Sequence, residues 1–438
     1  MVPDAAEPVS SPKVDRAAYL SGLVRLRREL DEAGSGLQSL RDRATALVQE
    51  QAIPSTREEE WRFTDLAPLL QQQFQSVVPQ AITLEEITPF CLTDAPHRLV
   101  FVDGVYAPSL STLENLPPEV QVGNLGIVPG GIAHIGQQQG AEETFTALNT
   151  ACMTDAAVIW VAKGQEWCTP IHLLFVTTTR TATLSHPRCV VIAEAGSQLT
   201  LIEEFISLAG SAAAWVNSVT EIKLGTGATV NHTRIQRQGE QTFHIGKTAV
   251  SQARDSRYVA TAINWGAHLA RHHLEVYQTG EQTATILNGL TVLQGEQLGD
   301  THSLIAFTQP HGMAHQVQKC IVGDRAHAVF NGKIWVPQAA QLTNASQLSR
   351  NLLLSPRARV DTKPQLEITA DNVKCAHGAT VSQLEEDEVF YLQSRGIPAE
   401  MARQLLTFAF AAEVIDAMPL PTLRDRIRSD LSLRLNPG

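Results

Sequence analysis

The sequence has no segment apolar enough to cross a membrane. A transmembrane helix needs about 20 consecutive apolar residues, and the longest candidate, Leu405 to Ile415, is shorter and contains Glu413. Residues Met1 to Lys13 are polar, with no apolar core of a signal peptide behind them. We therefore expect a cytoplasmic protein that has no membrane partner.

Basic residues are also in deficit. The chain of 438 residues has 34 lysines and arginines against 45 acidic residues, which gives a formal net charge of −11. Such a charge repels phosphate backbones, and no basic patch with interleaved aromatic residues offsets it. This balance argues against nucleic acid as a partner.

Cysteine is sparse, and no C-x-x-C pair is present. The six cysteines are scattered at positions 91, 152, 168, 189, 320 and 375. This spacing fits neither a disulfide framework nor a cysteine-only metal site. Most of these residues are expected to be small buried side chains in a reducing compartment.

Common catalytic motifs are missing. There is no phosphate-binding G-x-x-x-x-G-K-[ST] loop, no G-x-S-x-G elbow and no H-E-x-x-H helix. A β-helical carbohydrate-active enzyme would need carboxylates grouped on one face. Carboxylates are sparse on the expected strands, at Glu194, Glu203, Glu221 and Glu275. We therefore expect a protein that is not an enzyme.

The patterns that are present divide the chain into three regions. Residues 1–150 begin with helical spacing at Tyr19, Leu23, Leu26 and Leu30, which Gly34 ends, and a second stripe follows over 37–47. Thr56 is followed by acidic residues and predicts the N-cap of another helix. This region is expected to be helical and mixed.

Residues 151–375 consist of short β-rich runs separated by turns, without an amphipathic helix between them. Both a sandwich and a stacked β-helix fit this pattern. A sandwich usually has about 100 residues, whereas a solenoid extends because each coil contacts only its neighbours. We therefore predict a β-helix, although its period in the sequence is irregular.

Residues 376–438 return to helical spacing. One helix is predicted over 385–395, ended by Gly396, and a second over 401–415. Leu423, Ile427, Leu431 and Leu435 then lie four residues apart on a last helix. Such a narrow apolar stripe suits docking either onto the protein's own core or onto a partner.

Histidines form two loose groups, His268, His272 and His273, and His302, His311 and His315. Residues two apart on a strand share a face, so His311 and His315 are expected to point the same way. Imidazole is a good ligand for iron or zinc. Without cysteine or carboxylate at fixed spacing, however, surface or hydrogen-bonded histidines are the better interpretation.

Cys375 and His377 are the sharper candidate site. Two positions apart on a strand, they face one way, and Lys374 is placed to lower the thiol pKa. A thiolate and an imidazole suit iron, but two ligands leave a four-coordinate site incomplete. A buried cysteine beside a hydrogen-bonded histidine is the alternative, which composition alone favours.

Longer strings of residues resemble the SufB/SufD family of the SUF iron–sulfur cluster assembly system. The most specific is Lys374-Cys-Ala-His-Gly-Ala-Thr-Val-Ser-Gln-Leu384, followed by Phe390-Tyr-Leu-Gln-Ser-Arg-Gly-Ile397. Further matching strings are Glu58-Glu-Glu-Trp-Arg-Phe-Thr-Asp-Leu66, Phe101-Val-Asp-Gly-Val, Val329-Phe-Asn-Gly-Lys-Ile and Pro364-Gln-Leu-Glu-Ile. Together they cover residues from about 50 to 420.

The resemblance implies a right-handed parallel β-helix core flanked by N-terminal and C-terminal α-helical domains. It also implies a complex in which the chain pairs with a SufB-type paralogue through the β-helix and binds the ATPase SufC through C-terminal helices. When alone, such a chain is expected to form a homodimer.

The resemblance is to the SufD branch of the family. Residues 355–364 lack the sulfur-accepting cysteine that SufB-type chains carry there. The SufD branch implies a non-catalytic scaffold with no stably bound cofactor. In it, His377, with Cys375 beside it, faces transient iron or a nascent cluster at the interface with SufB. A SufB-like scaffold that holds a cluster itself is the alternative.

Overall fold

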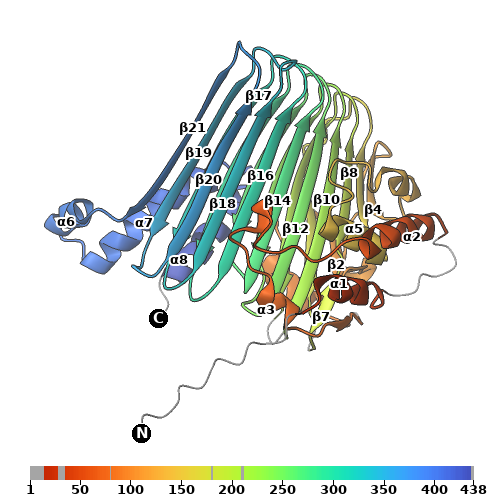
Figure 1. The fold of residues 1–438 in the computed structure, drawn as a ribbon, viewed down its shortest axis with the longest axis horizontal. Helices are drawn as coiled ribbons and strands as arrows, with labels where there is room; N and C mark the ends of the chain where they lie inside the picture. Colours follow the sequence, from red (N-terminus) through yellow and green to blue (C-terminus); the bar gives the residue numbers. More distant parts are fainter. Residues whose placement is uncertain (1–13, 28–34, 79, 179–180, 209–211, 436–438) are drawn as a thin grey trace, which may run out of the picture.

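In the computed structural model, a parallel β-solenoid forms the middle of the molecule and helices flank it (Figure 1). The structure describes residues 14–27, 35–78, 80–178, 181–208 and 212–435. Strands make up 41% of the chain against 24% for helices, and the solenoid has about 7 turns. The predicted β-helix is confirmed. The sandwich alternative is wrong, because consecutive coils pair through parallel strands.

Each coil of the solenoid contributes one strand to each of two sheets, which face each other across the interior. The first sheet contains β8 (Arg188–Ala193), β10 (Ala214–Leu224), β12 (Thr242–Gln252), β14 (Leu269–Gln278), β16 (Leu298–Phe307), β18 (His327–Val336) and β20 (Arg359–Ile368). The second contains β9 (Gln198–Ser207), β11 (Thr229–Arg237), β13 (Arg257–Asn264), β15 (Ala284–Leu293), β17 (Met313–Val322), β19 (Asn344–Leu353) and β21 (Lys374–Gln383). We call these the even-numbered and the odd-numbered sheet.

The turns between strands stack on one another as the strands do. Several contain a residue with positive φ, among them Gly227, Asp255 and His311. The amide of each donates to a carbonyl in the turn of the next coil, as His311 does to Gln341 at 3.0 Å. Because these turns differ in length, the repeat is irregular in sequence but regular in space.

The interior of the solenoid has apolar rows and also contains buried polar side chains. Val230 and Val276 are typical of the apolar rows, and both are fully buried. Among them, His232 lies 3.2 Å from Glu203 through Nε2 and 3.0 Å from the Tyr258 hydroxyl through Nδ1. Buried polar groups destabilise a fold unless they are hydrogen-bonded. These three side chains satisfy one another.

The N-terminal region packs against the first coils. Its helices are α1 (Arg16–Val24), α2 (Ser35–Gln49), α3 (Ala67–Leu70), α4 (Leu84–Ile87) and α5 (Thr144–Cys152). Its strands are β1 (Gln75–Ser76), β2 (His97–Val102), β3 (Val105–Tyr106) and β4 (Val120–Asn124), and β5 (Ala157–Val161), β6 (Ile171–Thr177) and β7 (Thr183–Ser185) lead into the solenoid. The first predicted helix is present, but Leu30 and Gly34 lie outside the described residues.

The helix predicted to begin at Thr56 is wrong. Only a short 3-10 turn forms there, η2 (Glu59–Trp61), with Glu58 at its start. The segment crosses the outer face of the even-numbered sheet instead, and its side chains bind that face. Thr64 donates to Asp300 at 2.5 Å, and the Arg271 guanidinium lies 3.8 Å from the Trp61 ring centre. These contacts replace the helix that local sequence favours.

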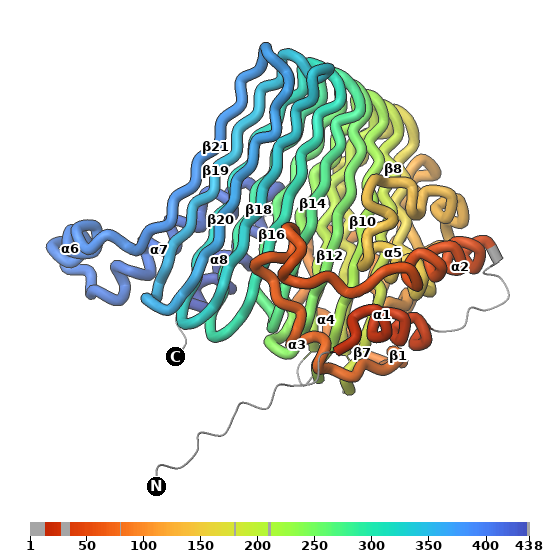
Figure 2. Tube along the Cα trace, viewed as in Figure 1, coloured from red at the N-terminus to blue at the C-terminus, as the bar shows by residue number. Residues whose placement is uncertain are grey.

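The three C-terminal helices are confirmed as α6 (Glu386–Ser394), α7 (Ala399–Asp416) and α8 (Pro421–Leu435). Ile427 and Leu431 of α8 are fully buried, in one cluster with Ile235 and Trp265 on the outer face of the odd-numbered sheet. The last helix therefore docks onto the protein's own core. Helix α6 lies at the end of an arm that projects from the solenoid (Figure 2). No helix in the described part of the chain is both long and apolar enough to span a membrane.

Strand pairing crosses the positions at which the three regions were divided. Strand β2 belongs to residues 1–150 but pairs with β6, and β21 continues past position 375 to Gln383. The division into three domains therefore stays a prediction.

Candidate functional site

The solenoid is closed at its N-terminal end and open at its C-terminal end. At the first end, β3 and β4 add antiparallel to the two sheets. At the other end, β20 and β21 are the last strands of their sheets, and no described strand pairs with their outer edges. Unpaired edges and uncapped repeats are where another polypeptide can add. The open end is therefore a candidate interface.

Cys375 and His377 lie on this last coil and share a face, as their spacing predicts. In the register of β21 with β19, Cys375 is opposite Ala345 and His377 is opposite Gln347, and both of these β19 residues are buried. Gln347 in turn donates to Gln316 on the preceding coil at 2.8 Å. Cys375 and His377 thus occupy, on the last coil, the positions that face the interior on the coils before it.

The predicted effect of Lys374 on Cys375 is wrong. Lys374 is the neighbouring residue on the strand and therefore points to the opposite face. Cys375 packs against the apolar core, and this partial burial raises the pKa of its thiol, although a backbone hydrogen bond from Ala345 opposes the shift. The thiol is held in its protonated form at neutral pH, so a bound metal would have to displace that proton.

His377 is exposed at the open end. No hydrogen bond or ion pair joins its ring to any other residue that the structure describes. Around His377 and Cys375, moreover, the described residues supply no third cysteine, histidine or carboxylate that would complete a ligand group. The imidazole is available to a ligand, but this chain alone does not complete a metal site there.

The other histidines do not form the groups that the sequence suggested. His311 lies in a turn with φ of 62°, so it does not share a strand face with His315. His315 is exposed on β17 and lies 2.7 Å from the Ser346 hydroxyl. His272 is buried beside Thr248, and His268 is exposed before β14.

Three of the four strand carboxylates considered for a carbohydrate-active enzyme are engaged separately. Glu203 is inside the solenoid, whereas Glu221 pairs with Arg188 at 2.5 Å. Glu194 accepts a hydrogen bond from the Trp160 indole at 2.9 Å. These three carboxylates therefore do not form a catalytic pair on one face.

A second group of ligand-type side chains, which sequence reasoning missed, lies on the outer face of the even-numbered sheet. His273 and Glu275 are on β14, and His302 lies opposite His273 on β16. Glu143 precedes α5, and Glu60 comes from η2. All five line one cavity of about 180 Å³. Only the spacing of His273 and Glu275 was visible in the sequence, because the other residues come from distant segments.

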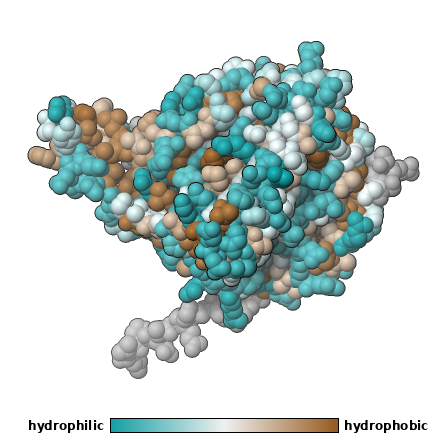
Figure 3. Space-filling view, turned by 90° about the horizontal axis from the view of Figure 1, so that it is seen from above, coloured by the Kyte–Doolittle hydropathy of each residue, from teal (hydrophilic) through white to brown (hydrophobic). Residues whose placement is uncertain are grey.

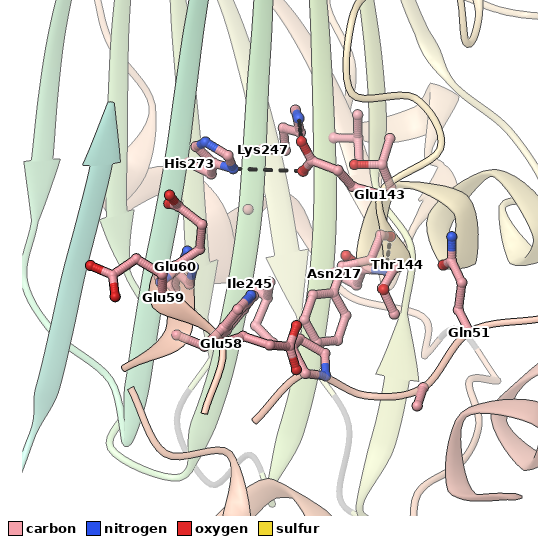
Figure 4. A pocket seen from close by; sticks show the side chains of 18 residues that line it. Gln51, Glu58, Glu59, Glu60, Glu143, Thr144, Asn217, Ile245, Lys247 and His273 are labelled. Atoms are coloured by element: carbon pink, nitrogen blue, oxygen red, sulfur yellow. Dashed lines mark hydrogen bonds and ion pairs between the residues drawn. The ribbon is translucent and has the colours of Figure 1, made fainter. Parts of the chain in front are cut away.

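His273 in this group lies between two carboxylates. Its Nδ1 is 3.6 Å from Glu143 Oε2, and its Nε2 is 3.2 Å from Glu275 Oε1. The Lys247 ammonium lies 2.7 Å from Glu143 Oε1 and 2.9 Å from Glu275 Oε2. Figure 4 shows His273 and Lys247 converging on Glu143. The imidazole and the ammonium therefore use different oxygens of the same two carboxylates.

Two carboxylates of this group, those of Glu143 and Glu60, have lowered pKa values. Burial opposes the charge of Glu143, but the hydrogen bond with His273 and the positive charge of Lys247 outweigh it and lower its pKa to about 2. A hydrogen bond with His302 at 3.0 Å lowers the pKa of Glu60 to about 2. The group borders a larger cavity of about 490 Å³ beneath residues 51–61 (Figure 4).

A third feature is an exposed apolar surface on α6 and α7. Phe390 is 69% exposed and Tyr391 58%, and Met401 and Leu405 are about half exposed. The projecting arm in Figure 3 is accordingly richer in hydrophobic residues than the neighbouring solenoid surface. Large exposed aromatic and aliphatic side chains that lie close together are typical of a protein interface.

Comparison with known proteins gives the family. Residues 175–410 match the model of the SUF system FeS cluster assembly SufBD core domain, and residues 24–173 match the SufBD protein N-terminal region. An iron–sulfur cluster assembly SufBD family protein of Synechocystis is 43% identical, over 91% of each chain. The chloroplastic protein ABCI7 of Arabidopsis thaliana is 34% identical, over 90% of this chain and 85% of its own.

The iron–sulfur cluster assembly protein SufD of Escherichia coli is 30% identical, over 88% of this chain and 90% of its own. Both regions of the family model are thus matched in sequence order, and the structure supplies the solenoid and the flanking helices that the resemblance implied. The chain belongs to the SufBD family of iron–sulfur cluster assembly proteins.

Proposed function

We propose that the protein is a non-catalytic scaffold of the SUF system that pairs with a SufB-type paralogue through the open end of its solenoid. The open end carries the proposal, since β20 and β21 there have unpaired outer edges and inward-facing positions that no further coil covers. A paralogue with the same fold would cover these strand edges and inward-facing positions. In its absence, a second copy of this chain would take that place as a homodimer.

His377 is the residue that we propose to act at this interface. Its ring is exposed and continues a row of the solenoid interior, so a docked partner would cover it. A neutral imidazole suits iron or a nascent cluster as cargo, with the remaining ligands coming from the partner. Cys375, on the same face, is a second candidate ligand whose protonated thiol makes it the weaker one.

We further propose that α6 and α7 bind the ATPase SufC. Helix α8 uses its own apolar stripe to dock on the solenoid, so it is not the docking element. The exposed side chains of Phe390, Tyr391, Met401 and Leu405 leave α6 and α7 as the available helical surface. The cytoplasmic location stays a prediction of the sequence, and the name of one relative places that relative in the chloroplast.

The test replaces His377 by Ala within the complex of this chain, the SufB-type paralogue and SufC. We expect the complex to form normally and cluster assembly to fall at least tenfold. The matched control is His315→Ala, which removes another exposed histidine of the same sheet. Assembly that proceeds at the same rate with His377→Ala would remove His377 from the mechanism.

The SufB-like alternative is tested by reconstituting the isolated chain with iron and sulfide under anaerobic conditions. We expect no stable cluster, because the described residues offer only His377 and Cys375 at the open end. A stable cluster on the isolated chain, lost in the Cys375→Ser variant, would instead establish a scaffold that holds the cluster itself.

A further inference from the structure

We propose that Glu143, His273 and Glu275, with Glu60 beside them, form a binding site for one divalent transition-metal ion on the outer face of the even-numbered sheet. This site is separate from the open end of the solenoid and does not depend on the proposed function. Its donor set of imidazole and carboxylates suits Fe²⁺, Mn²⁺ or Zn²⁺.

The spacing of the ligand atoms fits a shared ion. One ligand atom from each of Glu143, His273 and Glu275 lies within 4.8 Å of the other two. Two ligand atoms that each lie about 2.0–2.2 Å from one ion are separated by about 3 to 3.6 Å at tetrahedral or octahedral angles. The imidazole lies between its two carboxylates, with Nδ1 3.6 Å from Glu143 Oε2 and Nε2 3.2 Å from Glu275 Oε1. An ion on one ring nitrogen would therefore already lie beside one carboxylate, and the side chain of the other would turn to reach it.

The balance of charge around the site points the same way. Carboxylates of Glu60, Glu143 and Glu275 surround it, and Asp300 lies behind His302. The permanent cations that face these carboxylates are Lys247 and Arg271, and Lys333 at the cavity wall is paired with Glu367 at 2.8 Å. The carboxylates thus outnumber these permanent cations, and a divalent ion would offset the excess of negative charge.

Lys247 does not have to leave when an ion binds. Its ammonium contacts Glu143 Oε1 and Glu275 Oε2, whereas His273 faces Glu143 Oε2 and Glu275 Oε1. The lysine is therefore a positioning residue that fixes both carboxylates with their other oxygens turned toward the imidazole. The ion would join the N-terminal region, through Glu143 and Glu60, to β14 of the solenoid.

The experiment titrates the purified full-length chain, treated with a chelator, with Co²⁺ as a spectroscopic probe. We expect one equivalent of Co²⁺ to bind with visible d–d absorption, and Zn²⁺ to displace it. His273→Gln and Glu143→Gln should each weaken binding at least tenfold, whereas His315→Gln should bind as the wild type does. The ion should also raise the unfolding temperature of the wild type but not that of His273→Gln.

Three results would overturn the proposal. The wild type could fail to bind Co²⁺, the His273→Gln variant could bind it as tightly as the wild type, or His377→Ala could abolish binding, which would place the ion at the open end. Circular dichroism establishes that each variant is folded, and Glu143→Gln, at a 44% exposed side chain, serves if His273→Gln does not fold. Pairing of His273→Gln with the SufB-type paralogue is measured separately, so failure here leaves the proposed function standing.

Discussion

Val381→Glu tests whether the open end of the solenoid is the pairing surface. Val381 is on the same face of β21 as Cys375 and His377, and it lies opposite Asn351 of β19. It is 48% exposed. Complete burial of a valine is worth about 1.5–3 kcal/mol, so burial of the exposed half contributes about 1 kcal/mol to pairing. An unpaired carboxylate buried in its place costs a further 3–5 kcal/mol or so. The variant should therefore pair about a thousandfold more weakly.

The assay is sedimentation velocity of the chain mixed with the SufB-type paralogue, and of the chain alone for the homodimer. Val78→Glu, at a 69% exposed valine in the N-terminal region, is the matched control and should pair as the wild type does. Both variants should keep their urea midpoints, because both positions are exposed in the single chain. If Val381→Glu pairs as tightly as the wild type, the open end is not the interface.

Two further predictions concern the helices. Replacing Phe390 and Tyr391 together by Ala should weaken binding of SufC at least tenfold by calorimetry, because exposed aromatic residues often dominate an interface, whereas Leu433→Ala, at a 72% exposed residue of α8, should not. Burial alone would raise the pKa of Glu204, but Arg426, at 2.7 Å, and its other partners lower it to about 2. Since the folded pKa lies below the ordinary value of 4.5, this stabilisation is present above pH 4.5 and is lost as the pH falls toward 2. Glu204→Gln should lower the free energy of unfolding by about 3–5 kcal/mol at pH 7, with a smaller difference at pH 3 in urea titrations. An equal difference at both pH values would contradict this account.

The fold could be predicted because strand length and the absence of helices are local properties. Runs of short strands over more than 200 residues leave few architectures, and the solenoid satisfies the hydrogen bonds of each strand with its neighbours. The exact repeat could not be predicted. Ala214 pairs with Thr242 and His327 pairs with Arg359, so the coils differ in length, and the difference is absorbed in turns that the strand pattern does not record.

The errors came where long-range contacts outweigh local preference. The acidic residues after Thr56 favour a helix start, but Glu60 binds His302 on the sheet instead, and only the short 3-10 turn η2 forms in the segment. His311 has a strand-like spacing to His315, yet the stacked turns require a residue with positive φ at that position. In both cases the deciding partner is far away in sequence.

The sequence could predict that Cys375 and His377 share a face, but not that they lie on the last coil, which no further coil covers. Asn351 still donates to the Thr380 carbonyl at 2.9 Å, which is a bond between the last two coils of the odd-numbered sheet. After Gln383 the chain leaves the solenoid for α6, which projects away from it. No described strand therefore pairs beyond β21, and His377 stays exposed. This open position is the reason that we propose another polypeptide, and no part of this chain, as the source of the groups that cover His377.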